Sequence, residues 1–139
     1  MAIQSHLLHR LAERRREMGR AANYEQYLSG DTLAFCEALS RQVLALSVEV
    51  EERLNQKYIL YFVRGNKFAG FEPQKTKVLL ALTAVPYDEI DDPLGICKDK
   101  RNRRLSMGGE IRADLVPQLH SIDDAMNLVK QSFRKAGSF

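Results

Sequence analysis

The chain has 139 residues, of which 45% are hydrophobic and 28% charged, and its formal net charge is +3. These values suit one globular domain with a real core and need no disordered tract. The longest apolar stretch, residues 58–63, is far too short to span a bilayer, and arginines interrupt the amino-terminal segment where a secretion signal would need an apolar run. We therefore expect a cytoplasmic protein with no membrane partner.

The first thirty residues are predicted to form a helical extension that precedes a single domain of residues 31–139. Four apolar residues recur at helical spacing over residues 3–17, with arginines between them: Ile3, Leu7, Leu8 and Leu11. A second short helix is expected at about residues 21–28. The leucines would pack either on the domain or on a second copy of the chain.

A helix is predicted over about residues 31–47, because Asp31 suits its amino-terminal cap and Phe35, Leu39 and Val43 recur on one face. Cys36 lies beside that face, where a small buried thiol is the simplest interpretation. Beyond Ser47 the apolar residues alternate with acids, so we expect the helix to end and the chain to turn towards a sheet.

Residues 57–84 are predicted to form an antiparallel meander of three strands. Residues 58–63 are aromatic and β-branched, and the Gly65-Asn66 pair that follows is typical of a two-residue hairpin turn of type I′ or II′. The return strand runs to Glu72 and ends at Pro73, because proline cannot donate to the ladder. A third strand is expected over residues 78–84.

Residues 85–109 show no clean periodicity, and a loop of that length in a compact domain is usually functional or mobile. Residues 110–116 then alternate as a half-exposed strand. Ser121 and Asp124 make a capping box for a helix over about residues 122–135, and Gly137 stands where a carboxy-terminal cap belongs. The order of elements predicts a two-layer α+β fold, a mostly antiparallel sheet with both helices on one face.

The strongest candidate for binding is a run of basic residues within the long loop, hereafter the basic loop (residues 98–104). It contains five cations in seven residues, which could neutralise phosphates without reading sequence: Lys98, Lys100, Arg101, Arg103 and Arg104. Lys75 and Lys77 lie in a turn and would support it. The simpler alternative is a solvated basic loop.

An aromatic sheet face is a second candidate. Tyr61, together with Lys57, Lys67, Lys75 and Lys77, could stack and hold single-stranded nucleic acid. However, Tyr58, Leu60 and Phe62 alternate with Ile59, Tyr61 and Val63, and one of these two sets must cover the core. The sequence leaves open which set that is.

Two adjacent carboxylates, Asp91 and Asp92, could hold Mg²⁺ together with Glu72, as in phosphoryl-transfer sites. Asp-Asp-Pro is also a common turn opener, and we favour that interpretation. The acid-x-Lys spacing of nuclease cores is absent, because Lys75 stands one residue too far from Glu72. The cysteines, Cys36 and Cys97, form no metal-ligand motif, so we predict no metal site and no cofactor.

Several short motifs carry a family resemblance. Residues 33–133 resemble a prokaryotic domain family of unknown function labelled "predicted transport protein". The motifs are Lys57-Tyr58-Ile59, Phe68-Ala69, the run Glu72-Pro73-Gln74-Lys75-Thr76-Lys77-Val78, the run Asp91-Asp92-Pro93-Leu94-Gly95 and the closing helix from Asp123 to Phe133.

The resemblance implies a recognition module, since relatives occur alone or at the carboxy end of nuclease-like and restriction-like proteins. The chain departs from the family after Asp-Asp-Pro: residues 100–109 replace a Gly-His-Trp-Gly-x-Gly-like stretch and contain neither tryptophan nor histidine.

Three functional hypotheses follow. The first is a non-enzymatic binding module that contacts nucleic acid, or a nucleic-acid-processing partner, through the basic loop. The second is a metal-dependent nuclease or hydrolase that uses Glu72, Asp91 and Asp92. The third is a protein–protein adaptor or homodimer joined through residues 3–28.

Overall fold

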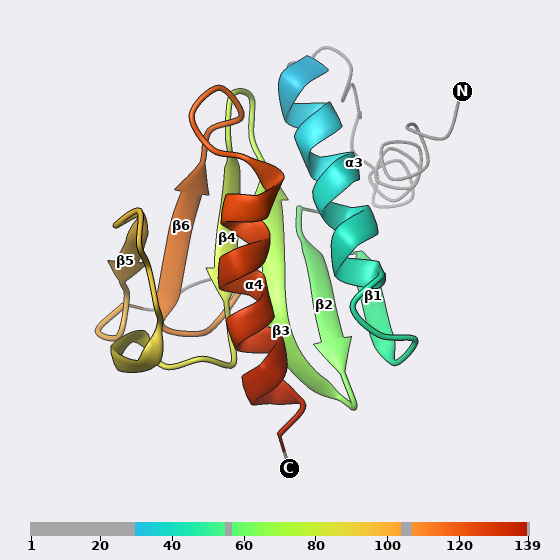
Figure 1. Cartoon of the computed structure of the whole chain (residues 1–139), viewed down its shortest axis with the longest axis vertical. Helices are drawn as coiled ribbons and strands as arrows, with labels where there is room; N and C mark the ends of the chain where they lie inside the picture. Colours follow the sequence, from blue (N-terminus) through green and yellow to red (C-terminus); the bar gives the residue numbers. More distant parts are fainter. Residues whose placement is uncertain (1–29, 55–56, 104–106, 139) are drawn as a thin grey trace.

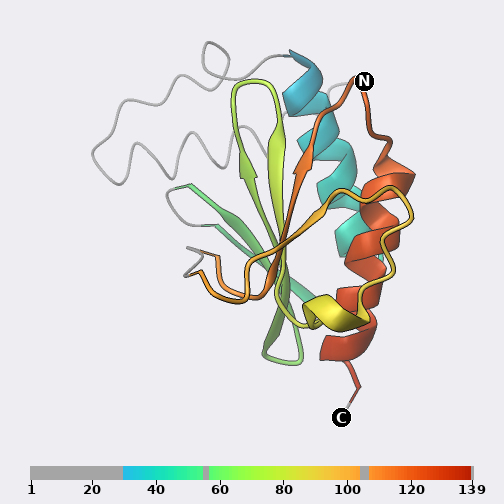
Figure 2. The ribbon, with the colours of Figure 1, turned by 90° about the vertical axis from the view of Figure 1, so that its left-hand side faces the viewer.

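The computed structural model describes residues 30–54, 57–103 and 107–138. Within these residues two helices lie against one face of a sheet, so the fold has two layers (Figures 1 and 2). In chain order the elements are α3 (Gly30–Leu44), β1 (Val50–Leu54), β2 (Ile59–Val63), β3 (Asn66–Pro73), β4 (Val78–Leu82), the 3₁₀ turn η1 (Tyr87–Glu89), β5 (Cys97–Asp99), β6 (Ile111–Leu115) and α4 (Ile122–Ala136).

The sheet is antiparallel throughout and has the order β1-β2-β3-β4-β6-β5. The predicted α+β class, the meander, the strand at 110–116 and the two helices are all confirmed. The predicted amino-terminal helices lie outside the described residues. Neither described helix has the length and apolar character that a membrane crossing requires.

Two strands were not predicted. β1 pairs with β2 from Val50↔Val63 to Leu54↔Ile59 and begins where the sequence indicated only the end of a helix. α3 accordingly ends at Leu44 rather than at about residue 47. β5 lies within the stretch that we expected to be irregular, and its residues Cys97 to Asp99 pair with β6 at the edge of the sheet.

The β2–β3 hairpin has the predicted two-residue turn, but one residue earlier than expected. Arg64 and Gly65 have φ of 50° and 80°, and positive φ at both central positions is the signature of a type I′ turn. Asn66 is not in the turn but pairs with Val63 as the first residue of β3. Its side-chain amide donates to the carbonyl of Ala136 at 3.1 Å, which ties the hairpin to the end of α4.

The core lies between the sheet and the two helices, and Tyr61 belongs to it. Its side chain is fully buried, and its hydroxyl lies 2.8 Å from Glu52 Oε2 and 3.0 Å from Ser40 Oγ. A buried tyrosine needs such partners for its hydroxyl. Of the two alternatives that the sequence left open, Ile59, Tyr61 and Val63 therefore cover the core, so Tyr61 is not on an exposed basic face, and Phe62 faces outwards instead.

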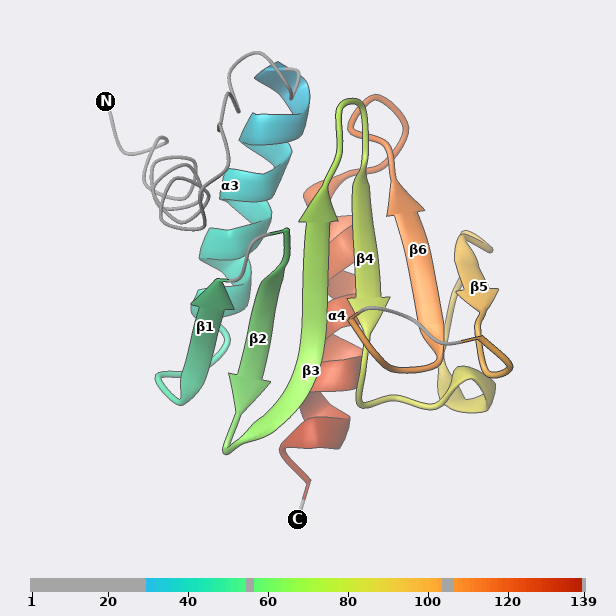
Figure 3. The same cartoon turned by 180° about the vertical axis from the view of Figure 1, so that it is seen from behind.

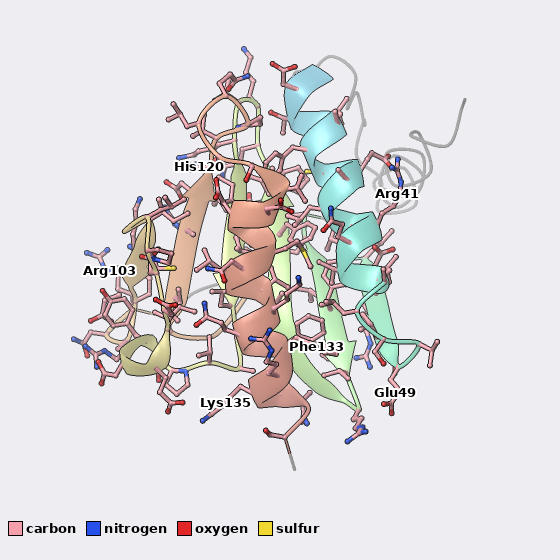
Figure 4. The ribbon with its side chains drawn as sticks, in the orientation of Figure 1. Arg41, Glu49, Arg103, His120, Phe133 and Lys135 are labelled. Carbon is pink, nitrogen blue, oxygen red and sulfur yellow. The ribbon has the colours of Figure 1, made fainter. Side chains whose placement is uncertain are left out.

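α4 begins and ends where the sequence predicted. The Ser121 hydroxyl accepts from the Asp124 amide at 3.0 Å, and the Asp124 carboxylate accepts from the Ser121 amide at 2.8 Å, which confirms the capping box. Gly137 is the carboxy-terminal cap, although its φ of −87° is right-handed. Phe133 points from α4 towards the sheet (Figure 4) and meets Phe68 edge-on, with the ring centroids 5.2 Å apart.

Candidate functional site

The face of the sheet opposite α3 and α4, hereafter the open face, carries the candidate site (Figure 3). The strand register aligns one residue from each of the six strands across this face. We call this line the transverse row: Arg53, Leu60, Gly70, Ala81, Arg112 and Lys98. Cations thus stand at both ends of the row, and small or apolar residues form its middle.

The middle of the open face is a small apolar cluster. Leu79, Ala81 and Met107 are buried there, with Leu60 packed against them. A Cβ on Gly70 would lie 2.9 Å from Leu60 Cδ2 and 3.0 Å from Met107 Sδ. Since real Cβ atoms essentially never come within 3.0 Å of another heavy atom, the missing side chain at Gly70 is what allows these two residues to pack together.

Three cations surround one carboxylate at the β5 end of the row, and we call this group the Asp114 cluster. Asp114 Oδ2 lies 3.0 Å from Lys98 Nζ and 3.3 Å from Lys77 Nζ, while Asp114 Oδ1 lies 3.4 Å from Arg112 Nε. Burial on its own would raise the pKa of Asp114, but hydrogen bonds from Lys98 and Lys77 outweigh it and hold that pKa below its ordinary value. The cluster has a net positive charge.

The structure therefore brings together two of the predicted binding residues, Lys77 and Lys98. They come from different segments, one preceding β4 and one within β5, and the β4-β6-β5 order places both beside Asp114. Sequence reasoning missed Arg112 and Asp114. Both stand on the exposed side of the alternating stretch at 110–116, and that alternation was the available signal.

Arg101 is engaged within the chain. Its guanidinium lies 2.7 Å from Asp99 Oδ2, 2.9 Å from Asp88 Oδ2 and 5.3 Å from the centre of the Tyr87 ring. The hydrogen bonds from Arg101 lower the pKa of Asp99. Two carboxylates thus offset the charge of Arg101, so Arg101 should attract a phosphate less strongly than Lys98.

The other predicted cations lie apart from the Asp114 cluster. Lys75 is exposed in the turn between β3 and β4. Lys100 follows β5 and donates its amide to the Glu110 carbonyl at 2.7 Å. Arg103 is exposed beyond β5, at the edge of the sheet (Figure 4), and Arg104 lies outside the described residues.

The three carboxylates of the nuclease hypothesis do not converge. Glu72 is on the open face in β3, whereas Asp92 lines a recess of about 180 Å³ beside α4, on the helix side of the sheet. Asp92 accepts hydrogen bonds from the amides of Ile96 and Cys97 at 3.2 and 2.8 Å, which confirms the turn interpretation. The amide of Asp91 donates to Gln131 Oε1 at 2.7 Å.

The remaining motif residues are structural in their contacts. Pro73 is buried at the end of β3, and Gln74 donates its amide to the Lys77 carbonyl at 2.8 Å. Pro93 lines the same recess as Asp92. Among the described residues there is no group of three histidine, cysteine or acidic side chains arranged to hold a metal ion.

An aromatic contact lies at the β1 end of the open face. The Arg53 guanidinium stands 4.0 Å above the centre of the Phe62 ring, a cation–π geometry, and it also lies 3.4 Å from Glu51 Oε2. Phe62 is half-buried. An aromatic ring and a guanidinium are thus stacked at a surface that the described helices leave uncovered.

A comparison with protein families matched residues 24–136 to the family described as "Domain of unknown function (DUF5655)". The matched range includes every residue of the transverse row and of the Asp114 cluster. No curated protein and no solved structure matches the chain.

Proposed function

Because the chain belongs to the family of the domain of unknown function DUF5655, we propose a function from its own surface: it binds nucleic acid on the open face, without cleaving it. The Asp114 cluster is the observation that carries this proposal. Three cations share one carboxylate there, so the cluster retains positive charge that a bridging phosphate would neutralise.

The exposure of the two lysines supports the proposal. The side chains of Lys77 and Lys98 are 36% and 50% exposed, so an incoming phosphate can reach their ammonium groups without unfolding the site. Lys100 and Arg103 follow at the same edge of the sheet and would extend the contact along a phosphate backbone. Contacts of this kind give affinity that is blind to sequence and sensitive to salt.

The separation of the carboxylates favours binding over catalysis. Glu72 and Asp92 lie on opposite sides of the sheet, and both oxygens of Asp92 accept backbone amides. The nuclease hypothesis in its stated form therefore gains no support. The adaptor hypothesis depends on residues 3–28, which lie outside the described residues, and it stays a prediction, as do a processing partner and a cytoplasmic location.

The test is fluorescence anisotropy with a labelled 20-nucleotide oligonucleotide, titrated between 50 and 200 mM salt. We expect the logarithm of affinity to fall linearly with the logarithm of salt concentration. The double variant K77Q/K98Q should bind more weakly, because it neutralises two fewer phosphates. Its salt slope should be smaller by about 1.4 for single strands or about 1.8 for duplex, since each neutralised phosphate adds roughly 0.7 or 0.9 to the slope.

The matched control removes the same charge from the opposite side of the molecule. Lys130 and Arg134 are exposed on α4, so K130Q/R134Q should leave both affinity and salt slope unchanged. Absence of binding at 50 mM salt would refute the proposal. Equal losses of affinity in the two double variants would also refute it, because they would show that binding depends on the net charge of the protein and not on the Asp114 cluster.

A further inference from the structure

Phe62 lies in a second part of the open face, where an aromatic ring and a recess stand beside each other. Besides carrying Arg53 over its ring, Phe62 lines a recess of about 470 Å³ at the end of the sheet, bounded by the β2–β3 hairpin and the end of α4. The recess is lined by Phe62, Gly65, Asn66, Lys67, Thr83, Ala84, Lys135, Ala136 and Ser138. The recess is shallow and open to solvent.

The recess combines an aromatic wall with cations. Lys67 stands directly opposite Phe62 in the β2–β3 register, and its ammonium comes so close to Gly108 that a Cβ there would lie 3.3 Å from Lys67 Nζ. Lys135 pairs with Glu89 at 2.7 Å on the far wall. Flat aromatic surface beside ammonium groups is the combination that suits a nucleobase with its phosphate.

The transverse row connects this end of the open face to the Asp114 cluster. Arg53 and Lys98 stand on β1 and β5, five strand spacings apart, which is about 24 Å at roughly 4.8 Å per spacing. Gly70 and Ala81 are buried in the middle of the row, where Leu60 and Met107 pack together, so the two ends of the row flank an apolar centre. An extended chain that crosses the open face would meet cations at the β5 end and the Phe62 ring near the β1 end.

We propose that the Phe62–Arg53 pair and its recess receive an unpaired nucleobase, so that the ligand of the open face is single-stranded nucleic acid. This inference rests on the function proposed above. In a duplex the bases are paired and stacked on each other, and a protein ring reaches a base only where the strand is single or splayed open. Arginine guanidinium planes also stack on bases, so Arg53 adds to the platform.

The experiment compares three fluorescein-labelled ligands by anisotropy with the full chain: a 20-nucleotide single strand, the same strand with abasic sites, and a duplex. Phe62→Leu retains an apolar side chain but removes the π face. It should weaken binding of the intact single strand roughly 5- to 150-fold, the range of one base–aromatic stack. Binding of the abasic strand and of the duplex should not change.

The matched control is Tyr87→Leu. Tyr87 also carries an arginine over its ring, Arg101 at 5.3 Å, but it is in η1 and does not line the recess beside Phe62. This variant should bind all three ligands as the wild-type protein does. A urea unfolding curve for each variant checks that the fold is retained.

The outcomes separate this inference from the proposed function. If Phe62→Leu binds the single strand as tightly as the wild-type protein, or weakens all three ligands equally, the stacking site is refuted while salt-sensitive binding still stands. If the duplex binds more tightly than the single strand, single-strand selectivity is refuted. If no ligand binds at 50 mM salt, the proposed function fails first, and the inference fails with it.

Discussion

Asp114→Asn should lower stability and strengthen nucleic-acid binding at the same time. The carboxylate makes close ion pairs with Lys77 and Lys98, whose side chains are 36% and 50% exposed. Solvent screening limits each such pair to about 0.2–1 kcal/mol, so losing both should lower the free energy of unfolding by roughly 0.4 to 2 kcal/mol. Removing the one negative charge among these cations should steepen the salt slope of binding by at most about 0.7–0.9, the value of a single additional phosphate.

The pH dependence of stability gives this prediction a second check. The folded-state pKa of Asp114 is lowered, so its stabilising contribution is complete above the unfolded value of about 3.9 and is lost as the pH falls through the folded value. The difference in stability between the wild-type protein and Asp114→Asn should therefore shrink below about pH 4. Urea unfolding at pH 7, 5 and 3 measures that difference.

The control for Asp114→Asn is Asp88→Asn. Asp88 is 76% exposed, and its partner Arg101 keeps a second carboxylate, Asp99, so this variant should cost less than about 0.5 kcal/mol. If Asp114→Asn is as stable as the wild-type protein and binds nucleic acid no more tightly, Asp114 does not organise the cluster, and the electrostatic reasoning is wrong.

Other substitutions and reagents test the fold around the site. Gly109→Ala should lower the free energy of unfolding by about 2–3 kcal/mol, because φ at Gly109 is +82° and the new Cβ would lie 2.7 Å from a backbone carbonyl oxygen. Gly95→Ala should lower it by only about 1 kcal/mol, because φ at Gly95 is +65° but no atom lies within 4 Å of the new Cβ. The midpoints of urea unfolding compare the two variants. Tyr61→Phe should lower the free energy of unfolding by about 1 kcal/mol, because it removes one buried hydroxyl while Ser40 and Glu52 remain hydrogen-bonded to each other. An unchanged melting temperature in calorimetry would contradict this. Burial raises the pKa of Cys36 to about 12, so a disulfide reagent at pH 8 should label Cys36 only as the chain unfolds, and rapid labelling of Cys36 in native buffer would contradict this. Partial burial and the neighbouring Asp92 carboxylate raise the pKa of Cys97 to about 12 as well, so this half-buried thiol should react more slowly than a free cysteine.

Elements with a strong local pattern could be predicted from the sequence. The strand at residues 110–116 alternates over its whole length, and the capping box at Ser121 marks the start of α4 within one residue. β1 was missed because only half of its residues face the core and it has three charged residues among five. β5 has three residues, too few for any periodicity, and only its pairing with β6 makes it a strand.

The candidate site depends on long-range placement that local patterns do not encode. Periodicity divided β2 into two equivalent sets, and the hydrogen bonds of Tyr61 with Ser40 and Glu52 decide which set is buried. Likewise, Lys77 and Lys98 are 21 positions apart in the sequence and meet only because β6 lies between β4 and β5. The positive charge of each segment could be predicted, but their convergence on one carboxylate could not.

The strand order also bears on how the protein folds. β1 to β4 are separated by only a few residues each and can pair one after another, whereas Leu82 of β4 must wait for Ile111 of β6, which is 29 positions further along the chain. Closing a loop of that length carries an entropic cost that slows the step, so we expect β6 to join the sheet after the meander has formed. The Asp114 cluster draws its residues from both sides of that loop. A chain that stalls before this step would have a formed meander and no assembled cation cluster, so ligand binding would report completion of the sheet.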